Sequence, residues 1–229
     1  MNRMKNIIND RNIPDTRIRF RFGRLEEAAA FSHLEQLREL RRRVCAAGLP
    51  FCGKENNPRM SFSPIIPEGY TSSCEYADLY LYKFVSGAEA AEKMRVLDDN
   101  RYILMSAERI PVFFPALEVS VNAVKYSVEA AEPVFTAGSL NRFLDMNTCI
   151  YERVRTSGKI QHFDVRELYR GAEIEDSGRK LVITLSFCPA GANLRPELAA
   201  NAIFGEFEVK GIKRLEFYWQ NSKGEFEVF

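Results

Sequence analysis

The segment RIRFRF at residues 17–22 alternates charged and apolar side chains without interruption. Such alternation predicts a strand with its isoleucine and two phenylalanines on one buried side. The other, exposed side then carries Arg17, Arg19 and Arg21. Three guanidinium groups in a row repel one another unless acids lie across from them or an anion binds. The pattern therefore leaves two interpretations open, a solvated face with cross-strand acids and an anion-binding face.

A well-delimited helix is expected after this strand. Ser32 and Glu35 have the spacing of a capping box, and Gly48 and Pro50 make continuation of the helix unfavourable. At 100° per residue, His33 lies on the same stripe as the leucines of this helix. We therefore expect His33 to face the core.

The rest of the first half alternates strands and a helix. Further strands are predicted at 60–66, 75–82 and 101–110, with a helix at 86–97. The order strand, helix, strand, strand, helix, strand is that of a ferredoxin-like unit, in which helices cover one face of an antiparallel sheet. Residues 15–110 are therefore predicted to form one such half.

Residues 120–229 repeat this order more loosely. The predicted elements are a strand at 123–129, a helix at 139–146, two strands between 149 and 169 that turn at 157–158, a strand at 181–187, a helix at 195–204 and a strand at 212–219. In the last strand, Leu215, Phe217 and Trp219 are expected on the buried side. The predicted fold is α+β, with two ferredoxin-like (βαββαβ) halves and antiparallel sheets.

Composition narrows the class of protein. The chain has 229 residues, and its 32 basic and 31 acidic side chains leave a net charge of +1, so overall charge does not indicate a polyanionic partner. Its five cysteines form no C-x-x-C pair, which argues against a disulfide framework or a zinc knuckle. No apolar run reaches the ~20 residues that span a bilayer. A cytoplasmic location with reduced thiols is expected.

Aromatic residues gather where the arginine row is predicted. The first and third strands of a ferredoxin-like sheet are central neighbours, so the tyrosines of 75–82 would lie beside the arginines. RNA-recognition domains stack bases on these two strands. The predicted RNA-binding residues are Arg17, Arg19, Arg21, Arg38, Arg42, Arg59, Tyr76, Tyr80 and Tyr82. Alternatively, a second protein layer covers this face and uses the tyrosines as core.

Three short blocks carry a family resemblance. They read Phe31-Ser32-His33-Leu34, Ala47-Gly48-Leu49-Pro50 and Asn57-Pro58-Arg59. In these blocks the chain resembles the radical SAM-linked protein family, uncharacterised bacterial proteins associated with cobalamin-binding radical SAM enzymes. The resemblance implies a partner role near such an enzyme, in modifying RNA or a translation component. The family has an aromatic residue before this last block and Pro-Lys after it, where this chain has Asn56 and Met60.

Several chemistries are poorly supported. The C-x-x-x-C-x-x-C cluster motif of a radical SAM enzyme is missing, and the two histidines have no metal-ligand spacing, so we expect neither a metal nor a cofactor. The preferred hypothesis is an RNA-binding or substrate-presenting accessory protein that acts with a separate enzyme.

Two alternatives remain. The tandem layout also resembles CRISPR repeat-processing endonucleases, some of which use a histidine on the first helix, so His33 is a candidate general base with Arg38 or Arg59 stabilising the phosphorane. A histidine on an apolar stripe is more often a packed core residue. The other alternative is a protein-docking adaptor that uses the tyrosine face as its interface.

Overall fold

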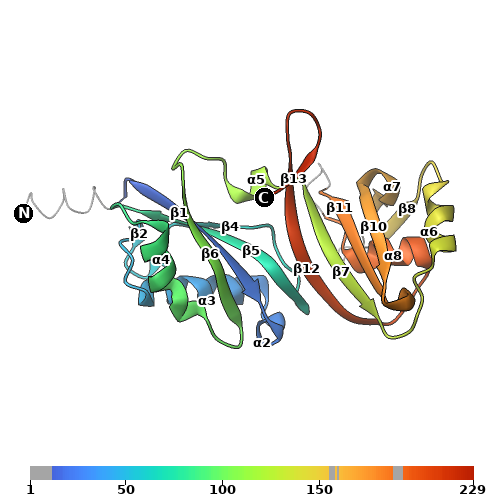
Figure 1. Ribbon diagram of the computed structural model, residues 1–229, viewed down its shortest axis with the longest axis horizontal. Helices are drawn as coiled ribbons and strands as arrows, with labels where there is room; N and C mark the ends of the chain where they lie inside the picture. The colour runs from blue at the N-terminus through green and yellow to red at the C-terminus, as the bar shows by residue number, and fades with distance from the viewer. Residues whose placement is uncertain (1–11, 155–157, 159, 188–192) are drawn as a thin grey trace, which may run out of the picture. The chain divides into compact units, whose positions relative to one another are not determined.

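The computed structural model describes residues 12–154, 158, 160–187 and 193–229, and Figure 1 shows the course of the chain. The chain forms two compact units that divide between Ser120 and Val121. Each unit combines antiparallel strands with helices, so the predicted α+β class is confirmed. None of the helices in the described ranges has the length and apolar content needed to cross a bilayer.

The first unit contains an antiparallel sheet in the order β4, β5, β1, β6. These strands span Met60–Phe62 (β4), Tyr70–Leu81 (β5), Thr16–Arg24 (β1) and Tyr102–Ile110 (β6). As predicted, the strand that carries the arginines pairs with the strand that carries the tyrosines. In this register Arg17 lies opposite Tyr80, and Arg21 lies opposite Tyr76.

Short helices and a small hairpin complete the first unit. They are α2 (Glu26–Ala29), α3 (His33–Ala46), the hairpin of β2 (Gly53–Lys54) and β3 (Asn57–Pro58), α4 (Gly87–Met94), the 3₁₀ helix η1 (Arg95–Leu97) and α5 (Leu117–Ser120). The predicted capping box of α3 is confirmed. The backbone N–H of Glu35 donates to Ser32 Oγ at 3.4 Å, and the N–H of Ser32 donates to Glu35 Oε2 at 2.8 Å.

The core of the first unit lies between one face of the sheet and the helices. Ile18, Phe20 and Phe22 are buried there with side chains of α3 and α4, including Leu40 and Val44. This is the face that the alternation at 17–22 predicted. His33 is only partly buried and lies outside this core cluster, because it is the first residue of α3.

The second unit has an antiparallel sheet in the order β10, β11, β7, β12, with β13 paired to β12. Its elements are β7 (Ala123–Ala130), α6 (Ala137–Leu144), β8 (Ile150–Val154), β9 (Ile160–Asp164), α7 (Val165–Leu168), β10 (Tyr169–Glu175), the 3₁₀ helix η2 (Asp176–Gly178), β11 (Lys180–Ser186), α8 (Pro196–Phe204), β12 (Val209–Gln220) and β13 (Phe226–Val228). Strands β8 and β9 form a separate hairpin.

The second unit departs from the predictions at three places. Helix α6 begins at Ala137, because Thr136 rather than Ser139 caps it. In β12, Phe217 is buried as predicted, but Leu215 is only partly buried and Trp219, one residue before the end of the strand, is 38% exposed. Strands β10 and β13 were not predicted. Most of the turn predicted at 157–158 lies outside the described residues.

Candidate nucleic-acid interface

The second face of the first unit's sheet contains a buried carboxylate between two arginines. Asp78 is fully buried and accepts hydrogen bonds from Arg17 at 2.5 and 3.1 Å and from Arg19 at 2.8 and 3.0 Å. Arg17 is itself 1% exposed. The predicted exposure of Arg17 is therefore wrong, and the alternative of a cross-strand acid is correct here, since Asp78 lies opposite Arg19.

The segment after β6 crosses over this buried cluster. Besides Asp78, the Arg17 guanidinium donates to the backbone carbonyl of Pro115 at 3.0 Å, to that of Val112 at 3.4 Å and to that of Phe114. Helix α5, at the end of the same segment, contacts β4 and β5. Arg17 therefore links the first strand to the segment 111–116, and this contact accounts for its burial.

Tyr76 also lies inside the protein. Its side chain is 5% exposed, and the guanidinium of Arg21 lies 5.8 Å from its ring centroid. Beside it, Ser63 Oγ donates to Glu75 at 3.1 Å and accepts from the N–H of Tyr76 at 3.2 Å. The prediction that Tyr76 is exposed is therefore wrong. Alternation in a strand identifies two faces, but it does not reveal which segments cover them.

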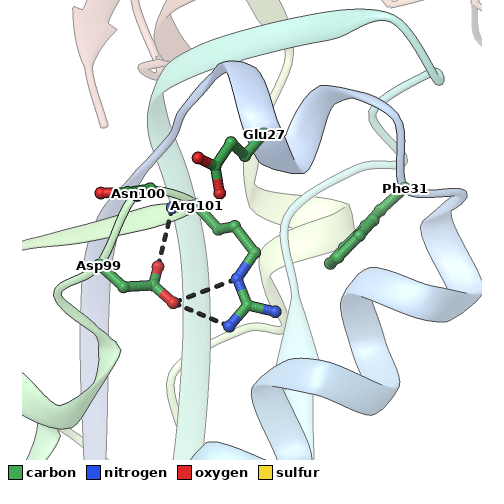
Figure 2. A pocket seen from close by; sticks show the side chains of 5 residues that line it. All are labelled: Glu27, Phe31, Asp99, Asn100 and Arg101. Atoms are coloured by element: carbon green, nitrogen blue, oxygen red, sulfur yellow. Dashed lines mark hydrogen bonds and ion pairs between the residues drawn. The ribbon is translucent and has the colours of Figure 1, made fainter.

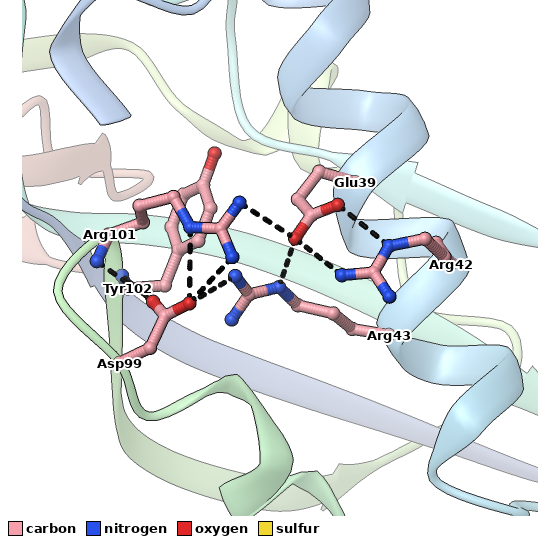
Figure 3. A network of polar contacts seen from close by, with 6 residues as sticks. All are labelled: Glu39, Arg42, Arg43, Asp99, Arg101 and Tyr102. Atoms are coloured by element: carbon pink, nitrogen blue, oxygen red, sulfur yellow. Dashed lines mark hydrogen bonds and ion pairs between the residues drawn. The ribbon is translucent and has the colours of Figure 1, made fainter. Parts of the chain in front are cut away.

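A charged network joins α3 to the start of β6 (Figure 3). Arg42 donates two hydrogen bonds to Glu39, at 2.8 and 2.9 Å. The buried Arg43 bridges Glu39 at 2.7 Å and Asp99 at 2.5 Å, and Arg101 contacts the same two carboxylates. Arg42, a predicted phosphate-binding residue, therefore forms an ion pair with Glu39.

This network shifts the ionisation of its members. Hydrogen bonding from Arg42, opposed by burial and reinforced by Arg43, lowers the pKa of Glu39 to about 2. For Asp99, burial acts upward, but hydrogen bonds from Arg43 and nearby backbone N–H groups hold its pKa well below the ordinary value. Burial raises the pKa of the adjacent Tyr102 phenol to about 12. The carboxylates are therefore ionised at neutral pH and neutralise the arginines.

A pocket of about 630 Å³ opens beside this network (Figure 2). It is lined by Glu27, Phe31, Asp99, Asn100 and Arg101. Figure 2 shows the Arg101 side chain between Asp99 and Phe31, with its guanidinium already bonded to Asp99. Two carboxylates against one neutralised arginine do not favour an anionic ligand, so this pocket does not support phosphate binding.

The residues of the ribonuclease hypothesis lie on α3 and in the loop that follows it. His33 is the first residue of α3 and is partly buried. Arg38 is exposed on the same helix, near Glu35, and Arg59 is exposed after β3. A catalytic role for His33, with Arg38 or Arg59 as the stabilising group, stays a prediction.

The loop of residues 49–59 is held against the end of β5 by backbone hydrogen bonds. Cys52 donates to the carbonyl of Tyr80 at 2.7 Å, and Arg59 donates to the carbonyl of Cys52 at 2.7 Å. The loop reverses at residues 55–56, between β2 and β3, and Gly53 in β2 lies opposite Pro58 with a φ of +120°. A Cβ there would lie 2.5 Å from the carbonyl oxygen of Asn57, so only glycine allows the two arms to approach this closely. These hydrogen bonds and the close approach at Gly53 thus fix the backbone conformation of the loop.

This path places Arg59 over an aromatic ring. Its guanidinium carbon lies 4.5 Å from the ring centroid of Tyr80, and the guanidinium carbon of Arg17 lies 5.0 Å from the same centroid. Arg59 is exposed, Tyr80 is partly exposed and Arg17 is buried. Cation–π contact fixes the position of Arg59 without neutralising its charge. Two predicted RNA-binding residues, Arg59 and Tyr80, are therefore in contact.

Two lysines extend this surface. The Nζ of Lys83 lies 5.8 Å from the ring centroid of Tyr82, and Lys54 is exposed in β2. Within the described ranges, no carboxylate lies within 4.0 Å of the charged group of Lys54, Arg59 or Lys83. These three cations, with Tyr80 and Tyr82, form a surface that we call the loop surface.

The loop surface includes a second pocket, of about 420 Å³. It is lined by Leu49, Pro50, Phe51, Gly53, Lys54, Glu55 and Tyr82. We call it the loop pocket. Lys54 and Lys83 were not predicted as site residues. Two features of the sequence could have indicated these lysines. Lys54 follows a glycine, which is typical of a tight turn, and Lys83 follows a tyrosine that is a candidate stacking residue.

Other chemistry-bearing residues do not form a site. In the β8/β9 hairpin, His162 Nδ1 lies 3.2 Å from Glu152, and both side chains are 60% exposed. Among the described residues, Cys45, Cys52, Cys74 and Cys149 form no disulfide bond. Cys188 lies outside the described residues. Over the part of the chain that the structure describes, no group of three or more His, Cys, Asp or Glu side chains is arranged to hold a metal ion.

The fold and the loop surface together define an α+β protein with a basic, aromatic candidate interface. The sequence model of a family described as "Uncharacterized protein conserved in bacteria" (DUF2344) matches residues 17–196. The chain belongs to this family of uncharacterised bacterial proteins. The match includes β1, α3 and the whole loop surface. A search of curated proteins finds no match to the chain.

Proposed function

We propose that this protein binds single-stranded RNA through the loop surface and serves as an accessory or substrate-presenting protein for a separate enzyme. The observation that carries the proposal is that Lys54, Arg59 and Lys83 are exposed, without carboxylate partners among the described residues, beside the rings of Tyr80 and Tyr82. Proteins that bind single-stranded RNA combine cations along the backbone with aromatic side chains on which bases stack.

The strand orders support the ferredoxin-like interpretation of both units. With the small hairpins and β13 left aside, the first unit has the order β6, β1, β5, β4, and the second has β12, β7, β11, β10. In each unit, the strand that comes fourth in the chain lies at one edge of the sheet, and the first, the third and the second strand follow it in that order. We infer that each unit is ferredoxin-like, with β8, β9 and α7 inserted in the second.

The proposed RNA contacts differ from the predicted set. Arg59, Tyr80 and Tyr82 remain, and the two lysines are added. Arg38 is exposed on α3 and can extend the path of the RNA. The remaining predicted residues contact other side chains of the same unit. Arg17, Arg19 and Arg42 pair with carboxylates, and the partly buried Arg21 lies over the ring of the buried Tyr76. Burial of Tyr76 leaves Tyr80 and Tyr82 as the partly exposed tyrosines of this face, and the protein-docking adaptor stays the alternative use of them.

The resemblance to the radical SAM-linked family supports a radical SAM enzyme as the working partner. In this proposal the enzyme supplies the chemistry and its own cofactor, while the present chain holds the RNA. No cofactor is assigned to this chain. A test is an assay of RNA modification by the partner with and without this chain.

The direct test is RNA binding at two salt concentrations. Fluorescence anisotropy of a short labelled single-stranded RNA is measured at about 50 and about 200 mM salt. A variant with Lys54, Arg59 and Lys83 each replaced by Gln is compared with the wild-type protein. The matched control replaces Lys210, Lys213 and Lys223, three exposed lysines of the second unit, by Gln.

Each lost phosphate contact reduces the slope of log Kobs against log salt by about 0.7 for single strands, so the loop-surface variant should lose about 2 units of slope. The control should bind as the wild type does. Equal loss in both variants would show that only net charge matters and would overturn the assignment of this surface. If the wild-type protein does not bind RNA at low salt, the proposed function is wrong.

A further inference from the structure

The loop pocket has the size and lining for one nucleobase. Its volume of about 420 Å³ is near the lower end of the range typical of small-molecule sites. Its walls include the rings of Phe51 and Tyr82, both partly exposed, together with Leu49 and Pro50. Aromatic and apolar walls of this kind receive a base that has left its stack.

The loop pocket also contains one acceptor of hydrogen bonds with no cationic partner. Glu55 lines the pocket, and within the described ranges no Lys, Arg or His nitrogen lies within 4.0 Å of its carboxylate. Lys54, the last residue of β2 and the one before Glu55, likewise has no carboxylate partner among the described residues. Two opposite charges that line one pocket without pairing remain available to a ligand.

The chemistry of Glu55 discriminates among bases. A carboxylate accepts hydrogen bonds and donates none when it is ionised. Guanine presents two adjacent donors on its Watson–Crick edge, N1–H and the N2 amino group, which match the two oxygens of one carboxylate. Cytosine and adenine present one amino group each, and uracil presents a single N–H between two carbonyl oxygens that a carboxylate repels. This edge is accessible only in an unpaired nucleotide.

We propose that the loop pocket holds one unpaired guanine, whose Watson–Crick edge donates to Glu55 and whose face packs against Tyr82 or Phe51. The inference rests on the proposed RNA-binding function and adds the class of substrate to it. Lys54, Arg59 and Lys83 then contact the phosphates on either side of the held nucleotide. The preferred RNA has a guanine in a loop or single-stranded end rather than in a duplex.

The test compares four labelled oligouridines that differ only in one central base, G, A, C or U. The wild-type protein should bind the guanine-containing RNA at least about fivefold more tightly than the all-uridine RNA, the low end of the discrimination expected for a two-bond contact to a base. In Glu55→Gln this ratio should fall to near one, because an amide donates as well as accepts. Glu68→Gln, at an exposed glutamate outside the pocket, should keep the preference.

The outcomes separate this inference from the proposed function. If Glu55→Gln keeps the guanine preference, or if the wild-type protein has none, the base assignment is wrong while salt-sensitive binding through the loop surface still stands. If Tyr82→Ala weakens binding to all four RNAs several-fold, base stacking in the pocket is supported. If neither Tyr82→Ala nor Phe51→Ala changes the binding of any of the four RNAs, the pocket is not the base site. Absence of RNA binding by the wild-type protein overturns both proposals.

Discussion

Replacement of Asp78 by asparagine tests the buried charge cluster of the first unit. The fully buried carboxylate accepts four hydrogen bonds, two from Arg17 and two from Arg19. Removal of one partner from a buried ion pair costs about 3–5 kcal/mol, because the remaining charge stays desolvated. We expect the lower end, about 3 kcal/mol, since Arg17 keeps its backbone carbonyl acceptors and Arg19 is 14% exposed.

The assay is thermal and chemical unfolding followed by circular dichroism. For a unit of about 120 residues, the unfolding entropy near the midpoint is about 0.25 kcal/mol/K, so 3 kcal/mol lowers Tm by about 12 °C. The control is Glu92→Gln, which also removes one carboxylate but on the exposed face of α4, and should change stability by less than about 0.5 kcal/mol. A loss below about 1 kcal/mol in Asp78→Asn would refute the reasoning, since the arginines would then not depend on this acid.

Two further predictions concern the network between α3 and β6. The pKa of Glu39 is lowered in the folded state to about 2, so its contribution to stability is complete above the ordinary value near 4.5 and is lost as pH falls toward 2. Glu39→Gln should therefore flatten the dependence of unfolding free energy on pH in this window, as measured by urea unfolding, and an unchanged slope would contradict the pairing. Tyr102 is fully buried, and its hydroxyl has no hydrogen-bond partner among the described residues. Tyr102→Phe should leave stability unchanged or raise it by up to about 1 kcal/mol, and a loss of more than about 1 kcal/mol would indicate a bound water that the hydroxyl requires.

The strand pattern at 17–22 predicted the buried face correctly because period-2 alternation depends only on local geometry. The predicted order of elements, rather than the local pattern, placed the arginine strand beside the tyrosine strand, and the pairing of Arg17 with Tyr80 agrees with it. The capping box at Ser32 and Glu35 was equally reliable, because both partners lie within one turn. The buried face of the first strand and the start of the helix are thus determined by residues close in sequence.

The burial of the second face could not be predicted in the same way. Arg17 is buried because backbone carbonyls about a hundred positions later in the chain reach its guanidinium, and no local pattern records that contact. Asp78 alternates with the tyrosines of residues 75–82, so the strand pattern puts it on the side predicted to be exposed. An aspartate opposite Arg19 and within reach of Arg17 was the signal that this face is internally neutralised.

The loop surface was predicted only in part. Arg59, Tyr80 and Tyr82 were named from charge and aromatic character, but their grouping with Lys54 depends on the path of the loop. That path requires the close approach at Gly53, which a sequence without relatives does not reveal. In β12, alternation likewise predicted the burial of Phe217, but it did not predict that Trp219, on the same side near the end of the strand, is 38% exposed.

The contacts of Arg17 with residues 112–115 have a consequence for dissecting the chain. A fragment that stops at Ile110, where the last strand of the first unit ends, would retain every strand of that sheet but would leave Arg17 without its carbonyl acceptors. The segment after β6 is thus part of the first unit's fold rather than a spacer. An autonomously folding N-terminal fragment has to extend to Ser120, where the first compact unit ends.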